Sequence, residues 1–192
     1  MPWDRDTAVL PASPRLMTAQ EYYAMPVGPP YSQLIEGELF MSPSPKFFHQ
    51  EIIGNLYYSL RSFLRRKPLG KIVLSPSDVE LDEHNVYQPD LYYVRRDRCH
   101  LIDEQGMKGA PDFVVEVISR STAKLDRERK LPNFARAGVH EFWAIVPTTN
   151  EVEVWKLADS VEEPAFRLSV GDTLSTDILP DWEMPVAEIF AR

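Results

Sequence analysis

A single glutamate inside an apolar run is the residue of this sequence that most directly suggests chemistry. Glu116 interrupts the segment Phe113-Val114-Val115-Glu116-Val117-Ile118, whose other members are all apolar. A strand of this composition is typically buried on both faces, and an unpaired carboxylate is costly to desolvate there. Glu116 therefore needs a cation, either a metal ion or the partner of a buried structural ion pair, unless it stands at a strand end that reaches solvent.

A second carboxylate stands near the start of an earlier apolar segment. Asp90 follows Pro89, and a proline belongs at the start or edge of a strand because it cannot donate a hydrogen bond to a sheet. Two carboxylates on neighbouring strands that face one gap offer the hard oxygen ligands that Mg²⁺ prefers, with room for waters and a phosphate. The alternative for Asp90 is an ordinary turn residue, since aspartate is common in turns.

A lysine is expected at the level of Glu116. About four residues at ~3.3 Å each separate Glu116 from the end of its strand, and eight residues at ~1.5 Å each separate Lys130 from a helix start near Thr122. The two distances nearly cancel, because the helix packs back along the strand. Lys130 could then orient a water or stabilise negative charge developing on a phosphate; the alternative is an ordinary surface lysine.

The elements that must position these residues alternate between strands and helices. Thr18 and Glu21 form a capping-box pattern that opens a short helix, residues 34–41 read as a β-hairpin, and apolar residues three and four apart predict a long helix over 46–66. Strands are expected over 71–75, 78–81, 89–94, 113–118, 142–146 and 151–155, the last as an antiparallel edge.

One further helix is predicted between the strands at 113–118 and 142–146. Ser121 or Thr122 can cap it, Pro132 lies inside it, and Gly138 supplies a left-handed stop after Ala137. Strand, helix and strand then form a right-handed crossover unit. The sequence therefore predicts an α/β fold with a mixed sheet flanked by helices.

Length and composition favour one domain in a reducing compartment. The 192 residues suffice for one sizeable core, which we expect over residues 17–192, after a loose N-terminal arm over residues 1–16. Cys99 is the single cysteine, no Cys/His cluster has the spacing of a structural zinc site, and no apolar run approaches the ~20 residues of a membrane span. We therefore expect a cytoplasmic protein.

The net negative charge of the chain comes from its C-terminal part. The net charge is −8; residues 141–192 contain eleven Asp and Glu against three Lys and Arg, which leaves eighteen of each in residues 1–140. Basic residues gather twice in this neutral part, and the ordinary reading of such groups is a solvated helix face. The first group is Arg61, Arg65, Arg66, Lys67 and Lys71, and the second is Arg120, Lys124, Arg127, Arg129 and Lys130.

Several segments together resemble the Uma-two family of predicted endonucleases, a branch of the PD-(D/E)xK nuclease superfamily. The resemblance covers roughly Thr18 to Ile189 and is carried by Leu34–Leu39, the segment from Ser42 to His49, Tyr87–Leu91, Pro111–Ser119, Lys130–Phe134 and Gly138–Trp143. It implies a restriction-endonuclease-like αβββαβ core, a divalent metal held by Asp90 and Glu116, and a catalytic lysine. In this superfamily the lysine normally stands two residues after the glutamate, where this chain has Ile118, and the resemblance places it instead at Lys130.

The sequence departs from the family pattern at two positions. Gln33 replaces a glutamate that would be an auxiliary metal ligand, and Val146-Pro147 stands where relatives tend to end the strand with Asp-Pro. His49 matches a family position on the long helix, where it would contact phosphate or carry a proton; the alternative is a structural hydrogen bond.

These observations predict a nuclease that depends on Mg²⁺ or Mn²⁺ and hydrolyses phosphodiester bonds of DNA. Asp90 and Glu116 would hold the metal while Lys130 assists the attacking water, and Arg120, Lys124 and Arg127 would contact the DNA backbone. RNA is the other substrate that the sequence leaves open. The alternative from another class is an inactive nuclease-like scaffold that binds nucleic acid or a protein partner, and a homodimer paired through 151–155 is a further expectation.

Overall fold

A six-stranded mixed sheet forms the centre of the molecule. In the computed structural model, which describes residues 15–192 apart from 27, 29–30, 42–43 and 120–121, its strand order is β11-β10-β9-β8-β6-β3. The strands are β3 (Gly70–Leu74), β6 (Leu91–Arg95), β8 (Phe113–Val117), β9 (Glu141–Val146), β10 (Glu151–Lys156) and β11 (Phe166–Leu168). β8 and β9 are parallel and the other neighbours are antiparallel.

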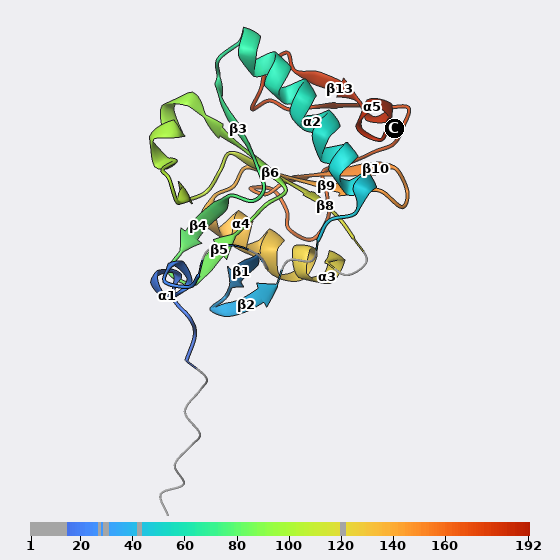
Figure 1. Ribbon diagram of the computed structural model, residues 1–192. Coiled ribbons are helices and arrows are strands. Elements are labelled where there is room, and N and C mark those ends of the chain that lie inside the picture. Colours follow the sequence, from blue (N-terminus) through green and yellow to red (C-terminus); the bar gives the residue numbers. More distant parts are fainter. Residues whose placement is uncertain (1–14, 27, 29–30, 42–43, 120–121) are drawn as a thin grey trace, which may run out of the picture.

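The long helix and the crossover helix cover opposite faces of this sheet (Figure 1). The helix α2 (Phe47–Arg66) buries Ile52, Leu56 and Leu60 against one face, as the three-and-four spacing predicts. The helix α4 (Leu131–Ala137) buries Leu131 and Phe134 on the other face. In chain order α2, β3, β6, β8, α4 and β9 reproduce the predicted αβββαβ core.

A second, five-stranded sheet was not foreseen. It has the order β2-β1-β5-β4-β7 and combines the predicted hairpin with strands that interrupt the core meander. Its strands are β1 (Ser32–Ile35), β2 (Glu38–Met41), β4 (Asp78–Asp82), β5 (Asn85–Tyr87) and β7 (Gly106–Lys108). Its residues Ile35, Val79, Tyr87 and Met107 share one apolar cluster with α4, so this sheet braces the crossover helix from outside.

The crossover helix differs from the single helix expected over 122–137. It consists of α3 (Ala123–Leu125), a π-helical turn η2 (Asp126–Lys130) and α4. Thr122 makes no side-chain cap bond, Ser121 lies outside the described residues, and it is Ser119 whose carbonyl accepts from the Ala123 N–H. Pro132 has no N–H to give to the helix ladder, and the preceding turn is the wider π form. Gly138 ends the helix with φ +92°, as predicted.

The strand at 151–156 is not a sheet edge, contrary to the sequence prediction. β11 pairs with β10 on the side opposite β9, so β10 is internal. The expected pairing of two copies through this strand is therefore wrong, because its hydrogen-bonding groups are already used within the chain.

The remaining elements lie outside these two sheets. The capping box opens α1 (Ala19–Tyr23) as predicted, η1 (Arg96–Leu101) follows β6, and the chain ends with β12 (Thr173–Ser175), β13 (Glu183–Pro185) and α5 (Val186–Ile189), which pack near α2. Most of the arm expected over 1–16 lies outside the described residues, and its division from a domain over 17–192 stays a prediction. In the part of the chain that the structure describes, no helix is long and apolar enough to cross a membrane.

Candidate active site

The pairing of β6 with β8 brings the two predicted carboxylates together. Leu91 pairs with Val115 in antiparallel register, so Asp90, one residue before β6, falls opposite Glu116. Oδ2 of Asp90 accepts a hydrogen bond from the Val117 N–H at 2.7 Å. Asp90 is therefore fixed at the strand entry, beside Glu116, as Pro89 suggested.

Lys130 lies level with Glu116, as the strand and helix lengths predicted. Its Nζ atom is 2.9 Å from Oε1 of Glu116 and 3.0 Å from Oδ1 of Asp126. All three side chains are buried; that of Lys130 is 4% exposed. Asp126 is not among the site residues predicted from the sequence, although its spacing of four residues from Lys130 puts both on one helix face.

Burial and charge act in opposite directions on this cluster. Burial raises the pKa of Glu116 to about 8, although the charge of Lys130 works against that shift. Burial alone would lower the pKa of Lys130, but the charges of Glu116 and Asp126 outweigh it and raise that pKa above its ordinary value. Lys130 is therefore an ammonium ion at neutral pH and cannot act as a base.

His49 reaches the site from the first turn of α2. Its Nε2 atom is 3.1 Å from Oδ1 of Asp90, and each side chain is 20% exposed. Both oxygens of Asp90 thus have a partner, one from a helix and one from the backbone of β8. His49 lies within the site, and what it does there stays a prediction.

The donors suit a hard divalent cation with few protein ligands. Among the described residues no group of three or more His, Cys, Asp and Glu is arranged to hold a metal, and Asp90 and Glu116 would supply only two carboxylates. Mg²⁺ is commonly bound by one or two carboxylates together with waters and substrate phosphates. Three carboxyl groups, those of Asp90, Glu116 and Asp126, lie around the single ammonium of Lys130, and such an acidic cluster suits a cation.

Gln33 holds the backbone that leads into the site. Its Oε1 atom accepts a hydrogen bond at 3.1 Å from the N–H of Gln88, two residues before Asp90, and its side chain is buried. The substitution of glutamine for glutamate thus preserves an acceptor at this position. Val146, the other departure from the family pattern, is the last residue of β9.

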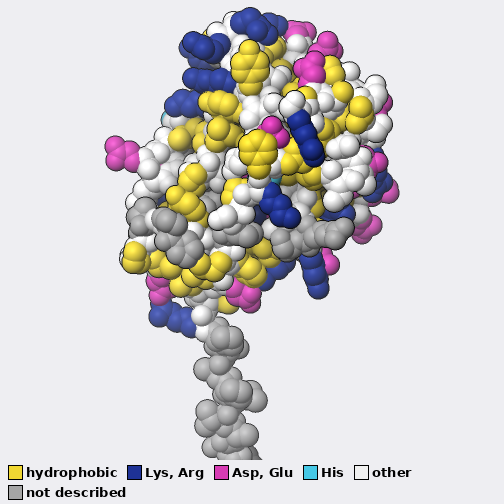
Figure 2. Space-filling view, turned by 45° about the vertical axis from the view of Figure 1, so that its right-hand side comes forward, with side chains coloured by type: hydrophobic (Ala, Val, Ile, Leu, Met, Phe, Trp, Pro, Cys, Tyr) yellow, Lys and Arg dark blue, Asp and Glu magenta, His cyan; other side chains and the backbone are white. Residues whose placement is uncertain are grey.

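The basic residues predicted to contact nucleic acid differ in their exposure and in their partners. Arg120 lies outside the described residues. Lys124 is 84% exposed and 3.8 Å from Glu128, whereas Arg127 donates at 2.8 Å to Glu153 of β10. The other basic group, at the end of α2, faces solvent; Figure 2 shows Lys and Arg side chains gathered at the upper left, on the side where α2 ends.

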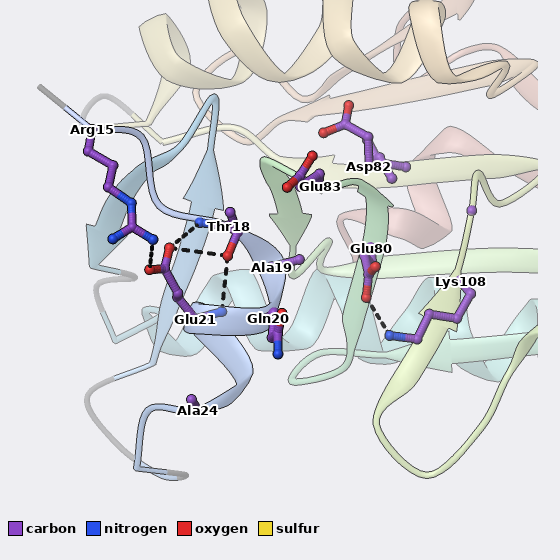
Figure 3. Close-up of a pocket in the computed structure, with 12 residues that line it drawn as sticks. Arg15, Thr18, Ala19, Gln20, Glu21, Ala24, Glu80, Asp82, Glu83 and Lys108 are labelled. Atoms are coloured by element: carbon purple, nitrogen blue, oxygen red, sulfur yellow. Dashed lines mark hydrogen bonds and ion pairs between the residues drawn. The ribbon is translucent and has the colours of Figure 1, made fainter. Parts of the chain in front are cut away.

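A large surface pocket lies away from Asp90, Glu116 and Lys130. It has a volume of about 830 Å³ and is lined by residues of α1, β4 and β7, including the Thr18–Glu21 capping box and the pair formed by Lys108 and Glu80 (Figure 3). None of the predicted site residues lines it. Its two basic residues are already paired, Arg15 with Glu21 and Lys108 with Glu80.

Comparisons with known proteins agree with this fold and point to one family. The Uma2 family model, described as "Putative restriction endonuclease", matches residues 19–187. A crystal structure of a "putative nuclease belonging to DUF820" from Anabaena variabilis ATCC 29413 superposes with a TM-score of 0.76 at 17% identity, covering 91% of this chain and 97% of that one. No curated protein matches the chain. The structural likeness establishes the restriction-endonuclease-like fold.

Proposed function

The chain belongs to the Uma2 family of restriction-endonuclease-like proteins, and from this premise we propose that it is a metal-dependent endonuclease that hydrolyses phosphodiester bonds of DNA. Family and fold indicate a nuclease with a nucleic-acid substrate. The metal, the choice of DNA over RNA and the residue roles are our proposal.

One observation carries this proposal. Three residues from separate segments, at the entry of β6, within β8 and in η2, converge on one small volume. Lys130 contacts Glu116 at 2.9 Å although the two are fourteen residues apart in sequence, and Asp90 is tied to the backbone of β8 one residue beyond Glu116. Buried acidic and basic groups of this kind are expensive to assemble, and an active site is a physical reason to keep them.

Asp90 and Glu116 would hold Mg²⁺ or Mn²⁺ beside the paired strands β6 and β8. When bound, the metal would lower the pKa of a coordinated water and polarise the scissile phosphate. Asp90 is prepared for this role, because the Val117 N–H and His49 fix the orientation of its carboxylate.

Lys130 would act as a fixed positive charge. Hydrolysis adds a water oxygen to phosphorus and breaks the bond to one ester oxygen, and negative charge accumulates on the phosphoryl oxygens on the way. An ammonium held by Glu116 and Asp126 can stabilise that charge without reorganising during the reaction. Glu116 must be ionised to bind metal, so its raised pKa predicts higher activity at mildly alkaline pH.

A plasmid-nicking assay over a metal series tests the proposal. The parent should nick supercoiled DNA with Mg²⁺ or Mn²⁺ and not with EDTA, and Glu116→Gln should be inactive. Glu153→Gln is a matched control, because Glu153 is a buried glutamate on the same sheet face that pairs with Arg127 instead of Lys130; it should remain active. The same assay with an RNA of equal sequence separates the two substrates.

The outcomes also distinguish the proposal from an inactive scaffold. Nicking that survives in Glu116→Gln, or that needs no metal, would contradict the assignment. DNA binding without nicking in any metal would favour a nuclease-like scaffold. A homodimer remains a prediction, now without the strand pairing on which it was based.

A further inference from the structure

The solvent-facing side of α2 combines aromatic, glycine and arginine residues in one continuous stripe. Its exposed residues recur three and four apart, at Phe47, Gln50, Gly54, Tyr58, Arg61 and Arg65. This is the spacing of one helix face. Eighteen residues at ~1.5 Å each give the stripe a length of about 27 Å.

The two aromatic side chains of the stripe are unusually exposed. Phe47 is 79% exposed and Tyr58 is 75% exposed, whereas Ile52, Leu56 and Leu60 on the opposite side of the helix are fully buried. The fold does not need these two rings on this face, since its core is complete without them. Exposed rings on a positively charged surface are a common platform for stacking unpaired bases.

Gly54 has no internal reason to be glycine. It lies in the middle of a twenty-residue helix, where glycine costs roughly 1 kcal/mol relative to alanine, and a Cβ added there would meet nothing within 4 Å. The absent side chain therefore leaves open surface between Phe47 and Tyr58. Glycine at such a place lets a ligand approach the helix backbone closely.

The charge of the stripe suits a polyanion. Arg61 and Arg65 have no ion pair among the described residues, although the chain as a whole carries a net charge of −8. The only acidic residue of α2 is Glu51, near its beginning. Basic residues in a last helical turn also complement the helix dipole, which accounts for Arg65 and Arg66 but not for Tyr58 or Gly54.

The stripe begins at the end of α2 that lies near the candidate active site, although Phe47 and His49 point to different sides of the helix. Phe47 precedes by two residues His49, which contacts Asp90 at 3.1 Å, and the basic end of α2 lies at the far side of the molecule (Figures 1 and 2). We propose that this face of α2 binds a single DNA strand flanking the scissile phosphate, with bases stacked on Phe47 and Tyr58 and phosphates at Arg61 and Arg65. The proposal rests on the nuclease function proposed above, for which it names the path of the substrate.

Fluorescence anisotropy of a labelled thymidine oligonucleotide of about 16 nucleotides, measured in EDTA, tests this path without cleavage. Tyr58→Ala should weaken binding about fivefold or more. The double variant Arg61→Gln/Arg65→Gln should reduce the slope of log affinity against log salt by about 1.4, for two lost phosphate contacts. Arg136→Gln, an exposed arginine on α4, is the matched control and should bind like the parent.

Gly54→Gln separates binding from folding. Because the site is open, this variant should melt at a temperature equal to or above that of the parent, yet bind the oligonucleotide several-fold more weakly. A destabilised fold could not produce that combination.

Parent-like affinity and salt slope in the tyrosine and arginine variants would overturn the proposal. So would a change in sedimentation on Tyr58→Ala with unchanged oligonucleotide binding, since the face would then join copies of the chain. Tighter binding of a duplex of the same length would overturn the single-strand assignment. Binding in EDTA does not depend on catalysis, so failure here leaves the nicking result of Glu116→Gln to be judged separately.

Discussion

Removing the ammonium of Lys130 should lower the unfolding free energy, because the buried carboxyl groups around it lose their counter-charge. In Lys130→Met the side chain keeps its approximate length but the contacts of Nζ at 2.9 Å to Glu116 and 3.0 Å to Asp126 are lost. Breaking a buried ion pair by removing one partner typically costs about 3–5 kcal/mol, because the remaining charge is uncompensated. We expect a loss of unfolding free energy of that size at about pH 9, where Glu116 is ionised in the parent, and a smaller loss at about pH 7.

The loss should grow with pH, and the sign follows from Glu116. Its folded pKa of about 8 lies above the ordinary value of 4.5, so the folded state holds this proton more tightly than the unfolded state does. The unfolding free energy therefore falls as pH rises from 4.5 to about 8 and then levels off. Without Lys130, which lowers this pKa, the fall should continue above pH 8 at up to about 1.4 kcal/mol per unit.

Urea unfolding of parent and variant at about pH 7 and about pH 9 measures both effects. Lys124→Met is the control, since Lys124 belongs to the same helical segment but is 84% exposed, and it should change the unfolding free energy by no more than about 0.5 kcal/mol. A loss in Lys130→Met as small as the control's, or the same loss at both pH values, would show that Lys130 does not compensate a buried charge on Glu116.

Three further predictions concern metal binding and the crossover helix. Mg²⁺ should raise the melting temperature of the parent more at about pH 9 than at about pH 6, because Glu116 with a pKa of about 8 must ionise to bind it; an equal shift at both pH values would contradict this. His49→Gln should weaken Mn²⁺ binding measured by calorimetry about 10–100-fold, because Asp90 loses its contact from α2; unchanged affinity would show that the contact is only structural. Gly138→Ala should lower the unfolding free energy by about 1–2 kcal/mol, because residues with a Cβ rarely adopt its φ of +92°; a thermal melt equal to the parent's would disprove it.

The sequence was most informative where local geometry alone determined a position. The match between strand rise and helix rise placed Lys130 beside Glu116, and Pro89 located Asp90 at a strand entry. These inferences needed only element lengths and the packing of a helix against its own strand. Asp126 was missed because an acidic residue in a charged helical segment is indistinguishable by pattern from a solvated one.

The sequence predictions were wrong or incomplete where pairing between distant segments of the chain determined the structure. β11 is a three-residue strand with an exposed phenylalanine, too short to be recognised, yet it converts the expected edge at β10 into an internal strand. β5 and β7 are equally short, and β7 joins β4 in parallel register, a long-range pairing with no local signal. Nothing in the sequence around Arg127 indicates that it pairs with Glu153.

The proposed activity depends on a cation site shared by Asp90 and Glu116 beside Lys130. The most direct measurement is an anomalous difference map from crystals of the protein grown with Mn²⁺. We predict a peak within about 2–2.6 Å of carboxylate oxygens of both residues, and its absence in crystals of Glu116→Gln. Mn²⁺ bound only at other residues of a well-ordered parent would contradict the proposed metal site.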